Sequence, residues 1–318
     1  MKVFVAGATG VLGRAAVPQL LAAGHEVFGL ARTPEKLLRV KMAGAEPMRG
    51  DVLDADAMRR IVKEIQPDAI VNLATAIPLK LRVNPKDWEL NDRIRREGTA
   101  NLLAAAQSVS LQIFVQESAA YVCRSQDADW ITEESPLTDH PFLRATIEME
   151  TAVRAASVPS VLLRFAALMS ADSWHTQQSV TALRRGLLPI IGDGGNYVSL
   201  IHAQDAAQSL VLALASPQKA AGQIFNVSDD SPAPMRDILP LAAQRLGAGK
   251  PRSVPLMMAK MIAGAVTVEV FTASYRLANL KIKQTLNFAP RYPTYREIWT
   301  QIVAEIGQRD FAPSDDLS

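Results

Sequence analysis

Three glycines near the start of the chain constrain its fold more than any other feature. Gly7, Gly10 and Gly13 lie in the stretch GATGVLGR, which follows the apolar run KVFVA and leads into a helical pattern over about residues 11–23. Glycines at this spacing let the backbone turn tightly and approach a pyrophosphate, whose charge is stabilised by the N–H groups and dipole of the helix N-terminus. A merely tight turn is the alternative, but the motif stands here in the strand-to-helix context that dinucleotide binding requires. The predicted cofactor loop comprises Gly7, Thr9, Gly10, Val11, Leu12, Gly13 and Arg14.

Short runs rich in β-branched residues alternate with longer helical patterns through the first half of the chain. The runs KVFVAG, EVFGL, DAIVNLA, QIFVQES and SVLLRFA are almost continuously apolar, and helical patterns separate them. Strands of a parallel sheet read this way because helices cover both faces of the sheet. The sequence therefore predicts an α/β protein with a Rossmann-type, doubly wound parallel sheet.

The alternation loosens after about residue 165, which predicts two regions. Residues 1–165 form the predicted dinucleotide-binding domain, and 196–227 are expected to return to the same sheet. Residues 166–195 and 228–308 are predicted to form a smaller C-terminal substrate-binding region, and 309–318 are predicted to be a flexible tail.

Composition and charge exclude several classes of protein. With 318 residues, 48% of them hydrophobic, the chain can bury a large core. Its 34 basic and 32 acidic residues leave a net charge of +2, which argues against nucleic acid as a partner. Lys260 and Glu269 interrupt the most apolar stretch, residues 254–273, so no membrane span and no membrane partner are expected. The single cysteine, Cys123, and the lack of a signal-peptide pattern after Met1 predict a cytoplasmic protein.

No metal site is predicted. The four histidines, His25, His140, His175 and His202, are isolated from one another, and Cys123 has no cysteine partner. No spacing typical of zinc ligands is therefore present. The expected partners are a dinucleotide cofactor and a small-molecule substrate.

The end of the second predicted strand indicates which dinucleotide is bound. An Asp or Glu at this point would accept hydrogen bonds from the ribose 2′-hydroxyl of NAD. The chain instead has Ala31 and Arg32 there, and an arginine suits the 2′-phosphate of NADP through a charge-assisted contact. Arg14 and Lys36 add positive charge nearby. Arg32 as an ordinary solvated turn residue is the alternative, but NADP(H) is favoured over NAD(H).

At this point the chain resembles the short-chain dehydrogenase/reductase superfamily, in particular the extended and atypical branches that include the NAD-dependent epimerase/dehydratase proteins. The resemblance covers roughly residues 1–300, and its motifs are specific through their order. They are GATGVLGR, GDVLD, VNLATA, REGTANLLAAA, ESAAYV, LLRFAAL, GDGGNYVSLIHAQDAA and FNVSD. The resemblance implies that Asp51 and Val52 face the adenine and that Leu73, Ala74 and Thr75 line the nicotinamide-ribose side.

The resemblance also implies catalytic residues, and here the chain departs from the family pattern. Ser118 matches the catalytic Ser/Thr, but the tyrosine and lysine of the Tyr-x-x-x-Lys pattern are replaced by Phe142 and Thr146. A positioned general acid is worth about 10²- to 10⁴-fold in rate, so its loss slows hydride transfer without forbidding it. Tyr121 and His175 are the remaining candidates for a proton donor, although Tyr121 as a packed aromatic residue is the alternative.

The substrate is predicted only by class. Relatives that act on nucleotide-sugars carry an arginine after the GDG turn, whereas this chain has Val198 there, so a nucleotide-sugar substrate loses support. Arg184 and Arg185 could hold an anion instead, or they could lie on a solvated helix face. Apolar side chains would suit an aromatic or lipid-like substrate, although methionines at helical spacing are more often core. They are Phe142, Leu168, Met169, Trp174, Met257, Met258 and Met261.

These features predict an atypical NADP(H)-dependent oxidoreductase that acts on a small, largely apolar carbonyl, enone or quinone-like substrate without the Tyr/Lys acid. Two alternatives stay open: a non-catalytic NADP(H)-binding redox sensor or regulatory protein, and a sugar epimerase/dehydratase-like enzyme. A homodimer is a possible assembly, because dimers through the two helices that flank the site are common in the superfamily that the chain resembles.

Overall fold

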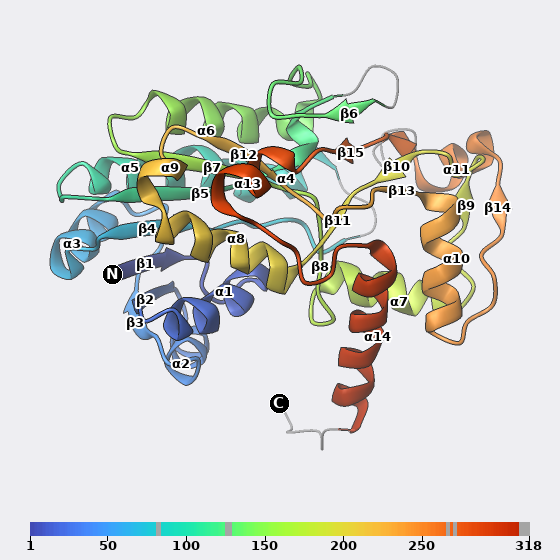
Figure 1. The fold of residues 1–318 in the computed structure, drawn as a ribbon, viewed down its shortest axis with the longest axis horizontal. Helices are drawn as coiled ribbons and strands as arrows, with labels where there is room; N and C mark the ends of the chain where they lie inside the picture. The colour runs from blue at the N-terminus through green and yellow to red at the C-terminus, as the bar shows by residue number, and fades with distance from the viewer. Residues whose placement is uncertain (81–83, 125–128, 265–267, 270–271, 312–318) are drawn as a thin grey trace.

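A computed structural model describes residues 1–80, 84–124, 129–264, 268–269 and 272–311. One half of the molecule is built around a seven-stranded sheet, and the other half contains helices and small two-stranded sheets (Figure 1). Most of the predicted tail, residues 312–318, lies outside the described residues.

The central sheet is entirely parallel, with the strand order β12-β7-β5-β4-β1-β2-β3. The chain begins in the interior of the sheet, winds outward to β3 and then continues on the other side of β1. This is the doubly wound arrangement predicted from the sequence, and in such sheets ligands bind at the carboxyl ends of the strands where the winding reverses. The strands are β1 (Lys2–Ala6), β2 (Glu26–Ala31), β3 (Glu46–Arg49), β4 (Ala69–Asn72), β5 (Ile113–Ala119), β7 (Ser160–Phe165) and β12 (Ile224–Val227).

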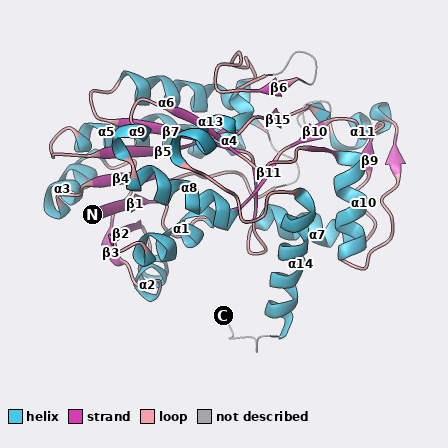
Figure 2. Ribbon diagram, in the orientation of Figure 1, coloured by secondary structure: helices cyan, strands magenta, loops and turns pink. Residues whose placement is uncertain are grey.

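Helices cover both faces of this sheet (Figure 2). One face packs against α1 (Val11–Ala22), α2 (Pro34–Met42) and α8 (Ala203–Ala215). The other face packs against α3 (Ala55–Ile65), α5 (Thr99–Ala106) and α6 (Arg144–Ala155). Between α3 and α5 the chain forms α4 (Pro85–Arg93), which continues into a π-helical turn, η1 (Ile94–Gly98).

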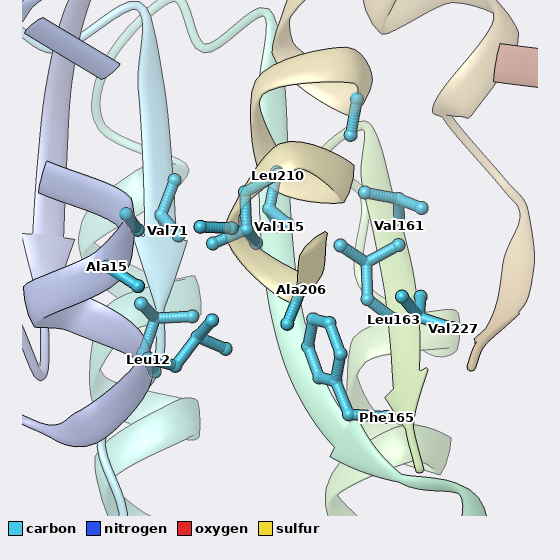
Figure 3. Packing of buried hydrophobic residues seen from close by; sticks show 14 of the residues in the cluster. Leu12, Ala15, Val71, Val115, Val161, Leu163, Phe165, Ala206, Leu210 and Val227 are labelled. Carbon is cyan, nitrogen blue, oxygen red and sulfur yellow. The ribbon is translucent and has the colours of Figure 1, made fainter. Parts of the chain in front are cut away.

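Successive strand residues belong to opposite cores. In β1, Val3 and Val5 pack into the core under α1 and α8, whereas Phe4 and Ala6 pack into the core under α3 and α5. Figure 3 shows the first of these cores, where Leu12 of α1 and Leu210 of α8 lie over the valines of the neighbouring strands. A fully buried side chain of this size contributes about 1.5–3 kcal/mol of hydrophobic free energy, so the sheet is a rigid base for the loops at its edge.

A third core lies in the second half of the molecule, which we call the C-terminal lobe. It joins α7 (Trp174–Arg184), α10 (Met235–Arg245) and α14 (Tyr295–Phe311), with Trp299 and Ile302 buried at its centre. The remaining short strands and helices of this half are β8 (Ala167–Met169), β9 (Ile190–Ile191), β10 (Tyr197–Val198), β11 (Leu200–His202), β13 (Ala233–Pro234), β14 (Ser253–Val254) and α11 (Leu256–Ala263). Other short elements lie against the sheet, namely η2 (Ala120–Val122), β6 (Trp130–Ile131), η3 (Pro141–Leu143), α9 (Pro217–Ala220), β15 (Arg276–Leu277) and α13 (Leu280–Leu286).

The segment 196–227 is shared between the two halves. Its last strand, β12, pairs with β7 in the central sheet, and its helix α8 packs on that sheet. Its first strands differ from the expectation, because β11 pairs with β8 and β10 pairs with β13 outside the seven-stranded sheet. At the other end of the chain α14 extends to Phe311, so the first residues of the predicted tail are helical.

Candidate active site

The glycine loop has the close backbone contacts that its motif predicts. Gly7 has a φ of +85°, and a Cβ atom there would lie 2.6 Å from the carbonyl carbon and oxygen of Leu73. A Cβ atom on Gly13 would lie 2.2 Å from the carbonyl oxygen of Gly7. Gly10 is the N-cap of α1 and provides no side-chain hydrogen bond to the first turn. The glycines therefore let the loop pack closely against the backbone after β4, and the first N–H groups of α1, which have no partner within the helix, can donate to a pyrophosphate, so the site fits a dinucleotide.

The loop after β4 lies directly beside the glycine loop and is held by a buried amide network. The Asn72 side chain donates to Gln116 Oε1 at 2.9 Å and to Thr99 Oγ1 at 3.2 Å, and it accepts the Ala74 N–H at 3.2 Å. The Ala76 N–H donates to Asn91 Oδ1 of α4 at 3.2 Å. Leu73, Ala74 and Thr75, the residues predicted to line the nicotinamide-ribose side, are thus fixed between the sheet and α4.

Arg32 and Asp51 meet at the ends of β2 and β3. Arg32 Nη1 lies 3.3 Å from Asp51 Oδ2, and both side chains are partly exposed. Asp51 Oδ1 also accepts the Leu53 N–H at 3.0 Å, while Val52 is buried. An exposed ion pair contributes at most about 1 kcal/mol, so Arg32 can turn toward a phosphate at little cost.

Arg14 connects the glycine loop to the C-terminal lobe. Its Nε donates to Asp172 Oδ2 at 2.8 Å, and its Nη1 donates to the Thr9 carbonyl oxygen at 2.8 Å. Asp172 lies between β8 and α7. Sequence reasoning assigned Arg14 to the cofactor but did not predict this partner, because the two residues are 158 positions apart.

The position of Ser118 does not fit the substrate-contacting role that the resemblance implies. Its side chain is fully buried, and its hydroxyl donates to Glu150 Oε1 at 2.6 Å. Glu150 in turn accepts hydrogen bonds from Arg164 at 2.9 and 2.6 Å, and both of these side chains are also buried. The hydroxyl is therefore hydrogen-bonded to the buried Glu150–Arg164 ion pair, which connects α6 to β7.

Neither predicted proton donor carries a readily released proton at neutral pH. Tyr121 is packed edge-on against Tyr275, with ring centroids 4.7 Å apart. Desolvation raises the pKa of Tyr121, and the Tyr275 hydroxyl raises it further, so the phenol is a weaker acid than in water. Desolvation lowers the pKa of His175, at the start of α7, so its imidazole is neutral at pH 7.

The positions predicted to correspond to the Tyr/Lys pair carry no group that titrates near neutral pH. Phe142, in η3, stacks on Trp88 of α4, with ring centroids 5.7 Å apart and an interplanar angle of 19°. Thr146 is buried in the first turn of α6. The stacked rings are partly exposed and form an apolar wall.

A buried ion pair that sequence reasoning missed lies at the carboxyl end of β5. Arg95 of η1 donates to both carboxylate oxygens of Glu117, at 2.6 and 3.2 Å, and to the Glu117 carbonyl oxygen at 3.0 Å. The register of β4 and β5 pairs Asn72 with Gln116, so Glu117 stands beside Leu73 and hence beside the glycine loop. Arg95 is 4% exposed, and its Nε has no hydrogen-bond partner among the described residues. The signal in the sequence is Glu117, a charged residue near the end of the mostly apolar run QIFVQES. The structure adds a second indication, because Arg95 lies in a π-helical turn and such turns are frequent at functional sites.

The described residues contain neither a cluster of metal ligands nor a membrane-spanning helix. Within the described residues, no three His, Cys, Asp or Glu side chains are grouped as metal ligands would be. Within the same part of the chain, no helix combines the length and the apolar character needed to cross a bilayer.

The sheet topology, the glycine loop and the fixed loop after β4 define a Rossmann-type dinucleotide-binding protein. The family of NAD dependent epimerases and dehydratases has a model that matches residues 3–228, and the chain belongs to that family. The predicted membership in the short-chain dehydrogenase/reductase superfamily is confirmed by this match and by the fold of solved neighbours. The protein is therefore an NAD(P)-dependent enzyme of the oxidoreductase and epimerase class, and its cofactor is a nicotinamide dinucleotide.

Several relatives are named as reductases, and one is named as a photosystem II assembly factor. The chain is 31% identical over 306 residues to a 3-diazoavenalumate denitrifying reductase of a Streptomyces species, covering 93% of this chain and 98% of the relative. It is 27% identical over 256 residues to a 4-hydroxy-2-methyl-3-oxo-4-farnesyl-3,4-dihydroquinoline-1-oxide ketoreductase of Stigmatella aurantiaca, covering 78% and 74% of the two chains. Its fold is similar to that of a human epimerase family protein crystallised with NADPH, with a TM-score of 0.78, 22% identity and coverage of 96% and 99%.

Proposed function

We propose that this protein is an NADP(H)-dependent reductase whose substrate accepts a hydride without a proton from a Tyr/Lys pair. The observation that carries the proposal is an intact glycine loop in a chain that has Phe142 and Thr146 at the positions predicted for the Tyr/Lys pair. A bound NADPH would supply the hydride. The relatives named as reductases support this direction of reaction, since the proposed substrate would gain two electrons.

The proposed cofactor contacts follow the order of the strands. The N–H groups at the start of α1 would hold the pyrophosphate, and Arg32 would leave Asp51 to bind the 2′-phosphate. Asp51 and Val52 would lie along the adenine, and the loop of Leu73, Ala74 and Thr75 would lie along the nicotinamide ribose. A guanidinium matches a phosphate bidentately, which is the reason for favouring NADP(H) over NAD(H).

The proposed substrate is a conjugated electrophile with an apolar body. In an enone or a quinone, the negative charge that arrives with the hydride delocalises onto oxygen, and solvent can protonate that oxygen afterwards. A diazo group on an arene is a second acceptor of this kind, and it is included because a denitrifying reductase is among the relatives. The rings of Phe142 and Trp88 would pack against the apolar body of either substrate.

Arg95 is the proposed group that compensates for the missing acid. Its guanidinium is buried at the carboxyl end of β5, beside the loop that would hold the nicotinamide. Its Nε–H lacks an acceptor among the described residues, and an unsatisfied buried donor costs about 1–3 kcal/mol. An oxyanion on the substrate, directly or through one water, would satisfy this donor and be stabilised by it.

One titration and one turnover assay test the proposal. NADPH and NADH are titrated separately into the protein, and the decay of nicotinamide fluorescence is then followed with a panel of enones, quinones, aryl diazo compounds and simple ketones. We expect NADPH to bind at least about tenfold more tightly than NADH, since a charged hydrogen bond contributes about 1.5–3 kcal/mol. Arg32→Ala should abolish this preference, whereas Arg39→Ala, an exposed arginine on α2, should leave it intact. Tight NADPH binding with no turnover on any compound would favour the non-catalytic redox sensor instead.

A second variant tests the missing acid. Phe142→Tyr combined with Thr146→Lys rebuilds the family pattern and should raise the reduction of simple ketones relative to quinones. A double variant that leaves ketone reduction unchanged while destroying a robust wild-type activity would mean that Phe142 shapes the substrate site. In that case, another group would supply the proton in the wild-type reaction.

A further inference from the structure

One end of the C-terminal lobe exposes an unusual number of large apolar side chains. Helix α11 has only Ala259 buried among residues 256–262, and Met257 and Met261 are 71% and 84% exposed. The sequence leaves Met257, Met258 and Met261 as either core or substrate wall, and in the structure they belong to no core cluster. The exposed apolar residues at this end are Leu187, Leu256, Met257, Met258, Met261 and Ile262.

The same end of the molecule carries an excess of positive charge, and Asp193 and Asp237 lie just outside the stretches that lack acidic residues. Two stretches of sequence, 173–192 and 238–268, contain six basic residues and no Asp or Glu, although the whole chain has a net charge of only +2. The rest of the chain is therefore net negative. All six basic side chains are exposed, namely Arg184, Arg185, Arg245, Lys250, Arg252 and Lys260.

Pairing of the short strands brings these two stretches together. β14 runs parallel to β9, with Ser253 opposite Ile190, and the Ile190 N–H donates to the Arg252 carbonyl oxygen at 2.9 Å. α7 leads into β9 and α10 into β14, and α11 begins two residues after β14. Figure 1 shows α10, β9, β14 and α11 together at the end of the molecule that faces away from the central sheet. We call this surface the basic apolar tip.

We propose that the basic apolar tip docks on the surface of a membrane that contains anionic lipids, with the methionines of α11 inserted at the level of the headgroups. Apolar side chains on one short helix with lysine and arginine around them are the arrangement that binds such an interface without spanning it. A second copy of the chain is disfavoured as the occupant, because it would bring two sets of six exposed positive charges together. The proposal departs from the expectation that the protein has no membrane partner, which considered only a spanning segment. It would also bring the proposed apolar substrate and the enzyme to the same surface.

Vesicle co-sedimentation of the full-length protein tests the proposal. The protein is mixed with vesicles of phosphatidylcholine alone or of phosphatidylcholine with phosphatidylserine, and the bound fraction is measured at low and high salt. We expect binding to the phosphatidylserine vesicles, release by salt, and little binding to phosphatidylcholine. Lys250→Gln with Lys260→Gln should weaken binding roughly thirtyfold, because each basic residue near the surface contributes about a factor of five.

The apolar contribution has its own variant and a matched control. Met257→Glu with Met261→Glu should abolish binding. Lys41→Gln with Met42→Glu makes a comparable change on α2, where Met42 is 79% exposed, and should have no effect. Circular dichroism and thermal melting check that every variant is folded. Absence of vesicle binding by the wild type, or equal binding to both kinds of vesicle, would overturn the proposal. So would a wild-type dimer in sedimentation velocity that the methionine variant converts to a monomer, since that result identifies a second copy as the occupant. None of these measurements depends on catalytic activity.

Discussion

Glu117 at the end of β5 and Arg95 of η1 form a bidentate ion pair with N–O distances of 2.6 and 3.2 Å, and it lies next to the loop predicted to carry the nicotinamide. Breaking such a pair by removing one partner leaves an uncompensated buried charge. We expect Arg95→Gln alone to lower the free energy of unfolding by about 3–5 kcal/mol in urea denaturation. Arg95→Gln with Glu117→Gln should be far less destabilised, because two neutral amides can still form a hydrogen bond.

The same double variant separates the catalytic from the structural part of this pair. Loss of one donor to an oxyanion costs about 10²- to 10³-fold in kcat, so we expect a loss of this order for quinone reduction by Arg95→Gln with Glu117→Gln. NADPH affinity should change little, since the role proposed for Arg95 is to stabilise the substrate oxyanion. A folded double variant with wild-type kcat would exclude Arg95 from the chemistry.

Gly13 provides a test of the cofactor loop. Its Cβ would lie 2.2 Å from the Gly7 carbonyl oxygen, so Gly13→Ala must displace the loop from the pyrophosphate. We expect NADPH affinity, measured by calorimetry, to fall by at least about tenfold, which corresponds to 1.4 kcal/mol. Gly249→Ala is the matched control, because a Cβ there meets nothing within 4 Å, and it should bind NADPH normally.

Ser118 should behave as a structural residue. Ser118→Ala removes the donor to Glu150 inside a buried ion pair, and we expect a loss of about 1–3 kcal/mol of stability. Its kcat should remain within a few-fold of the wild-type value. A fall of a hundredfold in kcat at unchanged stability would instead support the substrate-contacting role that the family resemblance implies.

Asp229 should make the protein less stable as pH rises. Burial raises the pKa of Asp229 to about 8, and its Oδ2 has no hydrogen-bond partner among the described residues. Between the ordinary pKa of a carboxyl, near 4, and the raised value, the folded state holds a proton that the unfolded state has released. The free energy of unfolding contributed by Asp229 is therefore highest below pH 4 and falls until about pH 8, after which it is constant. Asp229→Asn should flatten this decline and be more stable than the wild type at pH 8, as measured by thermal melting across that range.

The sequence by itself determined the sheet and the cofactor loop. Glycines at positions 7, 10 and 13 between a strand and a helix permit few alternatives, because any side chain at two of them would meet backbone atoms. Almost continuously apolar strands likewise require covering on both faces, and the parallel, doubly wound sheet confirms that prediction. These features are local in sequence, so their physical requirements can be read from short stretches.

Only the tertiary structure determined which side chains lie together at the candidate active site. Ser118 looked available by its place in a motif, yet its hydroxyl is turned to Glu150, a residue 32 positions away on another element. Arg95 and Glu117 are 22 positions apart, and although Glu117 begins the ESAAYV motif, no local pattern pairs it with Arg95; the fold brings the two side chains together. The same holds for the basic apolar tip, whose two stretches meet through the pairing of β9 and β14. A side chain's exposure and its charge partners depend on which distant segments pack together, and local sequence patterns do not specify that packing.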